Sequence, residues 1–538
     1  MGLLPCVGML SPLLAAIRLL QLKEWRWDRL RAHLREEGVI RSVWGRARMA
    51  LTLVLLSMSA VAQLTLTLRI DELAGFALMF MIASLPLTVC LHAVMSIAEL
   101  IIRRRQMPRW TAKALLTTIL GCALAGISVY ATFLFINACE DLECLSRMWT
   151  GSLLYAVLPL TASIFAFAGW IILLPLDRFL KQRILKQAKM LRASHKDLTV
   201  IGITGSVGKT TVKELLAHLL YERGAIATPA YVNSEMGVAN WMLRELGNRN
   251  SQFSILHSQF LIVEMGAYRK GEIALLCSIA KPHYGVLTFI GPQHTALFGS
   301  LQAIADAKAE LLESLPPLGK AFVNGDCDPC RDVSKRAGCA VVTIGTGGEC
   351  DLEAFDVEES GAGIRFRVKD TVYNVPLNGS HNVANVLLAI AVALELKMKP
   401  EEIAAKLRTF TPLAKTFSVR TERGVRVLDD THNASPMSFK AALAWAKSQP
   451  ESPKILLTSG LMELGEEQPA IHRDLGAYAA GIVDRVIFLN KKNVQDFQQG
   501  YGENIDVLSS FIERVPRGSL LLCISRMPSS VIEKVLPA

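Results

Sequence analysis

The distribution of apolar and charged residues divides the chain into two parts of different character. In the first third, four segments lack Asp, Glu, Lys and Arg altogether, at residues 49–68, 73–98, 114–139 and 148–176. A helix needs about 20 residues to cross the hydrocarbon core of a bilayer, and each segment reaches that length. The pattern therefore predicts an all-α domain of four transmembrane helices. A helical bundle buried inside a soluble protein is the alternative.

Basic residues indicate how these helices would be oriented. They precede the first segment, follow the second and follow the fourth, and loops rich in Lys and Arg stay on the cytoplasmic side of a membrane. We therefore expect a multi-pass protein of the bacterial inner membrane, with both termini and the domains after residue 196 in the cytoplasm. The residues concerned are Arg41, Arg46, Arg48, Arg103, Arg104, Arg105, Arg109, Lys113, Arg178, Lys181, Arg183, Lys186 and Lys189.

The region before the first predicted span combines tryptophans with arginines. Residues 23–48 contain Trp25, Trp27 and Trp44, a composition typical of a helix that lies in the membrane interface. A solvated basic helix is the alternative. Residues 1–22 are apolar but have no basic leading region and no clear cleavage site, so we expect no cleavable signal peptide.

After residue 196 the pattern changes to short apolar runs that alternate with helical stretches. Runs at 198–203, 260–263, 285–289 and 321–323 predict the strands of an α/β domain with a mainly parallel sheet. Later runs at 425–428, 454–459, 485–489 and 520–524 predict a second, Rossmann-like domain. The expected organisation is a basic interfacial segment (1–48), a transmembrane domain (49–176), a basic linker (177–196), a central domain (197–411) and a C-terminal domain (412–538).

Composition agrees with a membrane protein. The chain has 538 residues, 51% of them hydrophobic, and a formal net charge of +10. Much of that charge flanks the predicted helices, so we attribute it to topology and to contact with anionic membrane lipid. No basic and aromatic recognition module is present, so nucleic acid is not an expected partner.

Eleven cysteines are scattered along the chain, as expected for a reduced cytosolic body. Cys327 and Cys330 form a C-x-x-C pair that suggests zinc binding together with Cys339 and Cys350. Because a second C-x-x-C pair is missing, loop cysteines are the favoured interpretation.

A glycine-rich segment, GITGSVGKTT at residues 202–211, directly follows the first apolar run of the soluble part. Small residues let backbone N–H groups converge on phosphate oxygens, while Lys209 adds a positive charge and Thr210 offers a hydroxyl to Mg²⁺. The segment predicts a site for nucleotide phosphates, with a turn that binds no ligand as the alternative. The expected contacts to ATP are Gly205, Ser206, Gly208, Lys209, Thr210 and Thr211.

Polar residues also follow later strands of the same sheet. Glu264 comes directly after one apolar run and His294 lies just beyond another. Ligands bind at the carboxyl ends of parallel strands, and a carboxylate there can hold Mg²⁺. A lone histidine would more often be a surface or capping residue, but its place in this series makes it a candidate ligand.

Eight strings, in this order and spacing, resemble the Mur ligase superfamily from residue 199 to near the C-terminus. They are GITGSVGKTTVKE (202–214), VNSEMGV (232–238), EMGAYRKGEI (264–273), DAKAELL (306–312), VNGD (323–326), GSHNVANVLLA (379–389), DDTHNASPMS (429–438) and MELGEE (462–467). The resemblance is strongest to the branch that adds D-alanyl-D-alanine to the UDP-N-acetylmuramoyl-tripeptide. It implies a central P-loop ATPase domain with a parallel sheet, followed by a Rossmann-like domain that swings over the ATP site.

The resemblance also implies roles for individual residues. Glu264, His294 and Thr210 would hold metal, and Lys308 falls where the family carries a carbamylated lysine, another metal ligand. An ordinary surface lysine is the alternative for Lys308. The implied catalytic residues are Lys209, Lys308 and His294.

For the nucleotide, the resemblance implies that Asn382 and Asn385 contact adenine and that Asp430 holds the ribose. Lys415 stands where relatives have a Gly-Arg pair, and it would act on phosphate as a point charge.

The implied reaction consumes ATP in the presence of Mg²⁺. The γ-phosphate passes to a carboxylate of a cell-wall precursor, and the amine of an amino acid or dipeptide then attacks the acyl phosphate. Predicted membrane helices stand where relatives have a domain that binds UDP, so a UDP-linked and a lipid-linked acceptor both remain open. The alternatives are a polyglutamate-type ligase and an ATP-driven membrane transporter. The sequence does not predict an oligomeric state.

Overall fold

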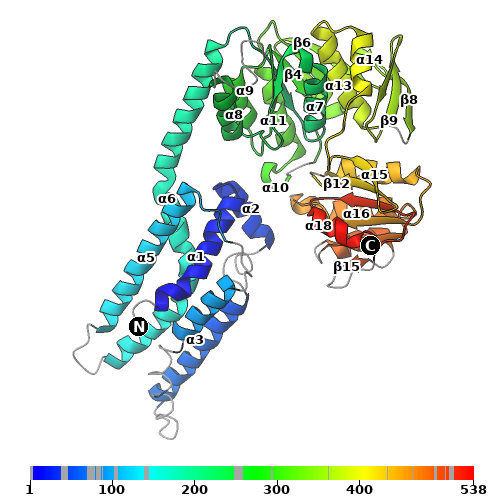
Figure 1. Ribbon diagram of the computed structural model, residues 1–538. Helices are drawn as coiled ribbons and strands as arrows, with labels where there is room; N and C mark the ends of the chain where they lie inside the picture. The colour runs from blue at the N-terminus through cyan, green and yellow to red at the C-terminus, as the bar shows by residue number, and fades with distance from the viewer. Residues whose placement is uncertain are drawn as a thin grey trace. The chain divides into compact units, whose positions relative to one another are not determined.

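The structure, a computed structural model, describes residues 4–37, 46–68, 79, 87, 89–101, 107–137, 144–247, 259–292, 295–360, 363–432, 434–462, 464–489, 493–502, 505–507 and 514–538. The chain divides into two compact units, Met1–Leu180 and Lys181–Ala538. Figure 1 labels the elements of both.

The described residues of the first unit are mainly helical, with turns or coil at 23–26 and 107–111. Its helices are α1 (Leu4–Leu22), α2 (Trp27–Glu37), α3 (Arg46–Thr67), a helix at Val89–Ile101, α5 (Ala112–Asn137) and the first part of α6 (Cys144–Ser194). Four stretches are long and apolar enough to cross a membrane: Leu4–Leu22, Ala47–Thr65, Ala112–Phe135 and Val157–Ser194.

Three of these stretches overlap the predicted segments 49–68, 114–139 and 148–176. The predicted segment 73–98 falls mostly outside the described residues, except for its end in the helix Val89–Ile101. The remaining long apolar helix is α1, which lies in the region predicted to be interfacial. Its side chains, including Leu13 and Ile17, are buried against those of α5 and α6.

Small and polar residues hold this helical unit together. A side chain at Gly169 of α6 would place its Cβ 3.1 Å from the carbonyl oxygen of Thr117 on α5, a tight contact, so glycine favours the close approach of the two helices. The fully buried Arg48 donates hydrogen bonds to the carbonyl of Gly8 at 3.0 Å and to Glu99 Oε2 at 3.1 Å. A buried charge is stable only with such partners.

The predicted basic linker is helical, because α6 continues without a break to Ser194. From Lys181 onward α6 belongs to the second unit, where Ala188 is buried among residues of the central domain. Arg192 donates to the carbonyl oxygens of Ala280, His195 and Leu198 at 2.9, 2.7 and 3.0 Å.

The central domain is built on a parallel sheet of order β2-β3-β1-β4-β5-β6-β7. The strands are β1 (Thr199–Thr204), β2 (Ala225–Ala227), β3 (Phe260–Glu264), β4 (Tyr284–Leu287), β5 (Lys320–Asn324), β6 (Ala340–Gly345) and β7 (Leu352–Glu353). Strand β1 is apolar on both faces, since Ile201 and Ile203 enter one core and Val200 another. Such continuous apolar runs are expected where helices cover both faces of a sheet.

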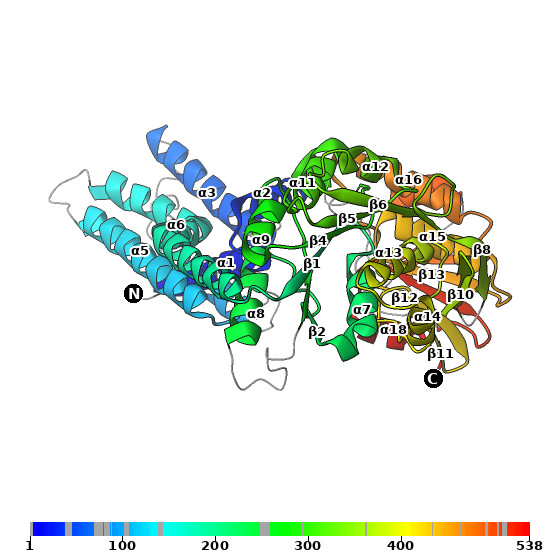
Figure 2. The same cartoon turned by 90° about the horizontal axis from the view of Figure 1, so that it is seen from above.

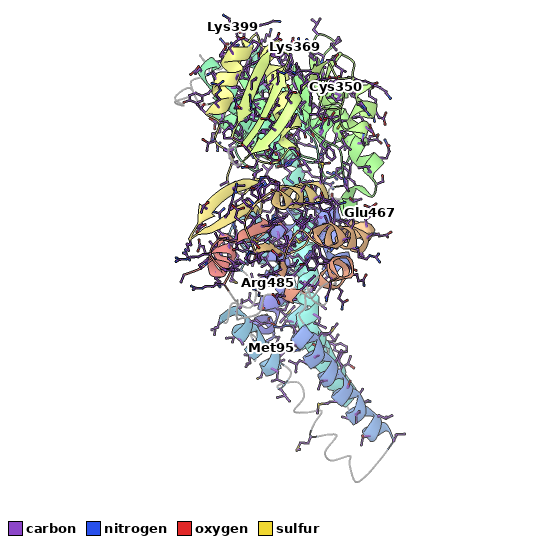
Figure 3. All side chains as sticks on the ribbon, turned by 90° about the vertical axis from the view of Figure 1, so that its right-hand side faces the viewer. Met95, Cys350, Lys369, Lys399, Glu467 and Arg485 are labelled. Carbon is purple, nitrogen blue, oxygen red and sulfur yellow. The ribbon has the colours of Figure 1, made fainter. Side chains whose placement is uncertain are left out.

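Helices cover the two faces of this sheet, as Figure 2 shows. On one face lie α7 (Lys209–Leu219), α13 (Asn382–Glu395) and α14 (Pro400–Arg408), and on the other α8 (Glu235–Gly247), α9 (Glu272–Ala280), α11 (Leu301–Glu313) and α12 (Asp328–Ser334). Shorter helices are η2 (Tyr221–Arg223) and α10 (Thr295–Phe298). An antiparallel sheet of β8 (Phe355–Ser360), β9 (Gly363–Val368) and β10 (Thr371–Val375) follows β7; Lys369, labelled in Figure 3, lies in the turn between β9 and β10.

The C-terminal domain has a second sheet, of order β11-β12-β16-β13-β14-β15. Its strands are β11 (Ser418–Glu422), β12 (Val425–Asp430), β13 (Lys454–Thr458), β14 (Arg485–Phe488), β15 (Asp506–Val507) and β16 (Leu520–Ile524). All pairs are parallel except β11 with β12. The helices are α15 (Pro436–Lys447), η3 (Gly465–Glu467), α16 (Gln468–Ala479), α17 (Val494–Tyr501) and α18 (Ser529–Val535).

Candidate active site

The glycine-rich segment forms a tight turn between β1 and α7. Gly208, which precedes α7, has φ of +86°, in the region that favours glycine. A Cβ at Gly208 would lie 2.2 Å from Asn385 Oδ1, and one at Gly205 would lie 2.0 Å from Thr288 Oγ1. The turn therefore has no room for larger residues at either position.

The loop that follows β4 holds this turn in place. The amide of Ser206 donates to the carbonyl of Phe289 at 2.6 Å, and the Ser206 hydroxyl donates to the carbonyl of Gly291 at 3.0 Å. Thr288 Oγ1 donates to the carbonyl of Val207. Because β4 is the neighbour of β1 in the sheet, the loop and the turn meet at the carboxyl edge of the strands.

Lys209, the first residue of α7, folds back over the turn. Its Nζ donates to the carbonyl oxygens of Gly205 and Ser206 at 2.7 and 3.0 Å. Burial lowers the pKa of Lys209, and the nearby Glu264 carboxylate partly offsets this effect. The ammonium group is thus held where phosphate oxygens would sit.

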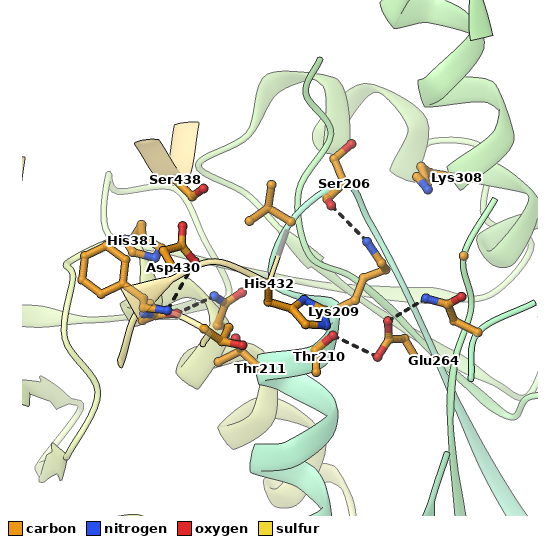
Figure 4. A pocket seen from close by; sticks show the side chains of 18 of the residues that line it. Ser206, Lys209, Thr210, Thr211, Glu264, Lys308, His381, Asp430, His432 and Ser438 are labelled. Atoms are coloured by element: carbon orange, nitrogen blue, oxygen red, sulfur yellow. Dashed lines mark hydrogen bonds between the residues drawn. The ribbon is translucent and has the colours of Figure 1, made fainter. Parts of the chain in front are cut away.

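Glu264, the last residue of β3, is the centre of a polar cluster (Figure 4). Thr210 Oγ1 donates to its Oε2 at 3.1 Å, and Asn233 Nδ2 donates to its Oε1 at 3.1 Å. The fully buried Nζ of Lys213 lies 3.6 Å from Oε2. A carboxylate and a hydroxyl side by side are hard oxygen ligands of the kind that Mg²⁺ prefers.

Lys308 lies on α11 and is only 3% exposed. Burial, together with the charge of Lys209, lowers its pKa to about 7. Its neighbour on the helix, Glu310, is occupied elsewhere, because it accepts from the amides of Gly271 and Ala274. The position is therefore not that of an ordinary surface lysine.

Two buried asparagines line the site at the start of α13. Asn382 Nδ2 donates to the carbonyl of Asn378 at 2.8 Å, and Asn385 Nδ2 donates to Asn382 Oδ1 at 2.9 Å. His381 precedes them, and its ring lies 4.9 Å from that of Phe417 in the C-terminal domain. Burial lowers the pKa of His381 to about 4, so this ring is neutral at physiological pH.

Asp430 ends β12 and enters the same cavity from the C-terminal domain. Its Oδ1 accepts from the amide of Phe417 at 3.3 Å, whereas Oδ2 is buried and has no hydrogen-bond partner among the described residues. Burial raises the pKa of Asp430 to about 6. A buried acceptor without a partner is costly and points to a ligand that supplies the missing donor.

Most of the predicted residues line one cavity, namely Ser206, Gly208, Lys209, Thr210, Thr211, Glu264, Lys308, Asn382, Asn385 and Asp430. Gly205 shapes the turn but does not line the cavity. Lys415 does not line it either, and its carbonyl accepts from the amide of His432. His294 lies outside the described residues.

Several residues of the site were not predicted from the sequence. Asn233 and Lys213 contact Glu264, Thr288 supports the phosphate turn, and Phe417 lines the cavity. Asn233 stands in the string VNSEMGV, which marks its region but gives no hint of its partner. The other three act through contacts between distant segments, which sequence spacing does not reveal.

The cavity suits a magnesium nucleotide on its own geometry. The tight turn and Lys209 suit phosphates, the oxygens of Thr210 and Glu264 suit Mg²⁺, and the free oxygen of Asp430 suits a hydroxyl of the sugar. No group of three or more His, Cys, Asp or Glu residues that could hold a metal is found in the described part of the chain. Fold and site together define the class of α/β proteins with a phosphate-binding turn, here with a cavity lined from two α/β domains.

Comparisons with known proteins narrow this class. A model of the Mur ligase middle domain matches residues 203–393, and a model of the Mur ligase glutamate ligase domain matches residues 417–513. The UDP-N-acetylmuramoyl-tripeptide--D-alanyl-D-alanine ligase of Bacillus subtilis is 30% identical over 340 residues, which cover 60% of this chain and 72% of that protein. The protein of the same name from Mycobacterium tuberculosis is 36% identical over 304 residues, 54% of this chain and 58% of that protein.

Among solved structures, the MurF ligase from Thermotoga maritima in complex with ADP matches with a TM-score of 0.57 and 26% identity, covering 66% of this chain and 82% of that one. The chain belongs to the Mur ligase family. It is therefore an ADP-forming, ATP-dependent ligase, and the predicted fold and enzyme classes are confirmed.

Proposed function

We propose that this chain joins D-alanyl-D-alanine, or a closely similar amine, to a carboxylate of a cell-wall precursor at a membrane surface. The observation that carries the proposal is the cavity between the two α/β domains, where Lys209, Glu264 and Asp430 face one another. The names of the B. subtilis and M. tuberculosis relatives support the choice of amine and acceptor.

The proposed chemistry has two steps. An acceptor carboxylate oxygen attacks the γ-phosphorus of ATP, which forms an acyl phosphate and releases ADP. The amine then attacks the acyl carbon, and phosphate leaves as the amide forms. Phosphoryl transfer depends on positioning and charge neutralisation more than on a protein nucleophile. The described lining, with its glycines, lysines and asparagines, supplies those two functions.

Each residue has a part in this scheme. Amides of the phosphate turn and Lys209 bind the β- and γ-phosphates, and Asp430 orients the ribose. Glu264 and Thr210 would hold Mg²⁺, and His294 and a carbamylated Lys308 would be its further ligands. Mg²⁺ supplies charge neutralisation on the transferring phosphate when it is bound.

The pKa of Lys308 supports its carbamylation. A lysine with a pKa of about 7 is neutral in a large fraction of molecules at physiological pH, and only the neutral amine reacts with carbon dioxide. The product is an anionic oxygen ligand, which suits a site next to phosphates.

The helices of the first unit support placement at a membrane. Several carry large apolar side chains that are exposed, such as Ile119, Ile127 and Phe133 on α5. Exposed apolar surface of this extent is expected where lipid covers it. We propose that the catalytic domains work at the cytoplasmic face of the bacterial inner membrane, with the precursor presented there.

Membership in a ligase family argues against the transporter alternative. A polyglutamate-type ligase remains a second candidate for the amine, because the C-terminal match is to the glutamate ligase domain of the family. The two candidates differ in the amine that triggers ADP release.

The test is ADP release by the full chain in detergent. A cell-wall precursor with a free peptide carboxylate is offered with D-alanyl-D-alanine, with L-glutamate or with no amine. We expect sustained release only when precursor and D-alanyl-D-alanine are both present. Release without an amine would contradict the ligase scheme, and preference for glutamate would favour the second candidate.

The variant Lys209→Ala tests the phosphate site. It is expected to abolish turnover, because the group that neutralises the phosphates is removed. Lys335→Ala is the matched control, since the Lys335 side chain is 75% exposed on the same domain. Activity that persists in Lys209→Ala would remove the proposed role of this residue.

A further inference from the structure

Cys327 and Cys330 lie where β5 ends and α12 begins, at the same sheet edge as the phosphate turn. The amide of Cys330 donates to the carbonyl of Cys327 at 2.9 Å, which closes a single turn between them. Pro329 sits inside this turn and fixes its backbone. Cys327 is the residue that precedes α12, and a C-x-x-C pair at the start of a helix is typical of redox-active dithiols.

The two side chains are free thiols, and their exposed fractions are 4% for Cys327 and 0% for Cys330. The Cys330 side chain lowers the pKa of the Cys327 thiol. No third metal-binding side chain completes a site around them in the described part of the chain. The pair is therefore a dithiol within one rigid domain.

A short path of contacts connects this dithiol to the phosphate turn. Cys327 Sγ donates to the carbonyl of Ile290 at 3.7 Å. The residues on either side of Ile290 are Phe289 and Gly291, whose carbonyls accept from Ser206 of the phosphate turn. Strand β4, which carries this loop, lies between β1 and β5 in the sheet.

We propose that Cys327 and Cys330 form a redox modification site, in which a small hydroperoxide converts the dithiol to a disulfide and thereby weakens nucleotide binding. The effect on the nucleotide rests on the proposed phosphate-binding function of the turn. The formation of the disulfide does not.

The reaction balances with the hydroperoxide as the only co-reactant. The Cys327 thiolate attacks the peroxide oxygen, so that an S–O bond forms, the O–O bond breaks and an alcohol or water leaves with a proton. The sulfur of Cys330 then displaces hydroxide from Cys327, and the hydroxide leaves as water with the proton of Cys330. Both sulfurs are oxidised and the peroxide is reduced.

The environments of the two cysteines decide which one attacks the peroxide first. The hydrogen bond from Cys330 is the largest effect that lowers the pKa of Cys327, to about 7, whereas burial raises the pKa of Cys330. Cys327 is therefore the nucleophile and Cys330 the resolving thiol. Both sulfurs are buried, so the oxidant class is a small peroxide that reaches them during local opening of the structure.

Oxidation changes the contact with Ile290. A disulfide sulfur has no hydrogen to donate, so the carbonyl of Ile290 loses the donor that it has in the reduced protein. The loop that holds Ser206 would then lose a fixed point on the side of β5. Loss of one hydrogen bond is expected to weaken ATP binding about fivefold.

The test uses the full chain in detergent, treated with hydrogen peroxide or kept reduced. Mass spectrometry of the peptide that contains both cysteines reports the disulfide as the loss of two hydrogens. Calorimetry then gives the dissociation constant for magnesium-ATP in each sample. We expect the disulfide to form, a dissociation constant about fivefold higher after oxidation, and full recovery with a dithiol reductant.

Variants separate this effect from general oxidation. Cys327→Ser and Cys330→Ser should make the affinity insensitive to peroxide, whereas the loop variant Cys339→Ser should behave as wild type. Absence of the disulfide, or a disulfide with unchanged affinity, would overturn the proposal. If the reduced protein did not bind ATP at all, the proposed function would fail instead, and the peptide would still report whether the disulfide forms.

Discussion

Gly208 shows how a single residue can be required by both backbone and packing. Its φ of +86° strains any residue with a side chain, and its Cβ would lie 2.2 Å from Asn385 Oδ1. We expect Gly208→Ala to weaken magnesium-ATP binding by more than about tenfold, because the turn must shift to relieve the clash. Calorimetry of the full chain in detergent measures this.

Gly518 provides the control for Gly208. It has φ of +85°, but a Cβ there would meet no atom within 4 Å. Gly518→Ala should therefore lower stability by about 1 kcal/mol, from backbone strain alone, and leave ATP binding unchanged. Equal effects of the two variants on binding would show that strain, rather than contact with Asn385, is what matters at Gly208.

The raised pKa of Asp430 predicts that the stability of the protein depends on pH. Its pKa is raised from 3.8 to about 6, so the folded protein binds a proton more tightly than the unfolded chain does. Ionisation of Asp430 lowers the free energy of unfolding. This loss of stability is absent below pH 3.8 and complete above pH 6, where it reaches about 3 kcal/mol. We expect the melting temperature of Asp430→Asn to rise relative to wild type between pH 4 and pH 7, while ATP binding weakens.

For the neighbouring Asp429, we expect the corresponding variant to lower the melting temperature. Its Oδ2 accepts from Arg420 at 2.9 Å, so Asp429→Asn loses an ion pair and should melt below wild type at pH 7. If Asp430→Asn behaved in the same way, the unpaired oxygen of Asp430 would not be the source of the penalty.

At the scale of residues, the sequence reveals side chains that would contact a ligand directly. Lys209, Thr210 and Glu264 stand at strand ends in a recognisable order, and the structure brings them to one cavity. Residues that act through a distant partner, such as Thr288 on the phosphate turn, could not be found in this way. Their partners are neighbours only because β1 and β4 pair in the sheet.

At the scale of elements, the end of α6 is the part of the fold with the clearest test. Arg192 donates to three backbone carbonyls, those of Ala280, His195 and Leu198. Buried carbonyls without donors are costly, so Arg192→Met should destabilise the second unit by about 2–4 kcal/mol. Hydrogen exchange in residues 181–198 and 274–283 should increase.

Lys186→Met is the matched control for Arg192→Met, because Lys186 is exposed on the same helix. Hydrogen exchange in this control should remain as in the wild type. Unchanged exchange in Arg192→Met as well would mean that the packing of Ala188 and its neighbours is enough to hold the end of α6 in place.

Elements with a strong internal pattern were predicted best. The apolar runs at 198–203 and 520–524 correspond to β1 and β16, because strands covered on both faces are apolar throughout. The antiparallel strands β8 to β10 were not predicted, although buried apolar residues alternate with polar ones along β9; β8 is exposed along its whole length. Helix α1 contains Arg18 and has the lowest mean hydropathy of the four long apolar helices, 1.5 against 1.6 to 2.2, and it fell within the predicted interfacial segment.

At the scale of the whole molecule, the order of motifs revealed the two-domain ligase, because each motif marks one strand end of a fixed topology. The resemblance implied that the second domain contributes Asp430 to the cavity, but it did not reveal that Phe417 of the same domain lines the cavity as well. That arrangement depends on packing between segments some 200 residues apart. The sequence also does not reveal whether the helical unit helps to bring the acceptor to the catalytic domains.

This leads to a prediction about the acceptor. If the first unit lies in a membrane, a lipid-linked precursor in the same bilayer is confined to the layer next to the enzyme, and confinement raises effective concentration. In liposomes we expect kcat/KM for a lipid-linked precursor to exceed that for a UDP-linked precursor with the same peptide by at least about tenfold. Diluting the lipid-linked precursor with excess detergent should remove this advantage, because the two molecules then occupy separate micelles. Equal kcat/KM values in liposomes would contradict the prediction and leave the helices as an anchor for an enzyme that takes its acceptor from solution.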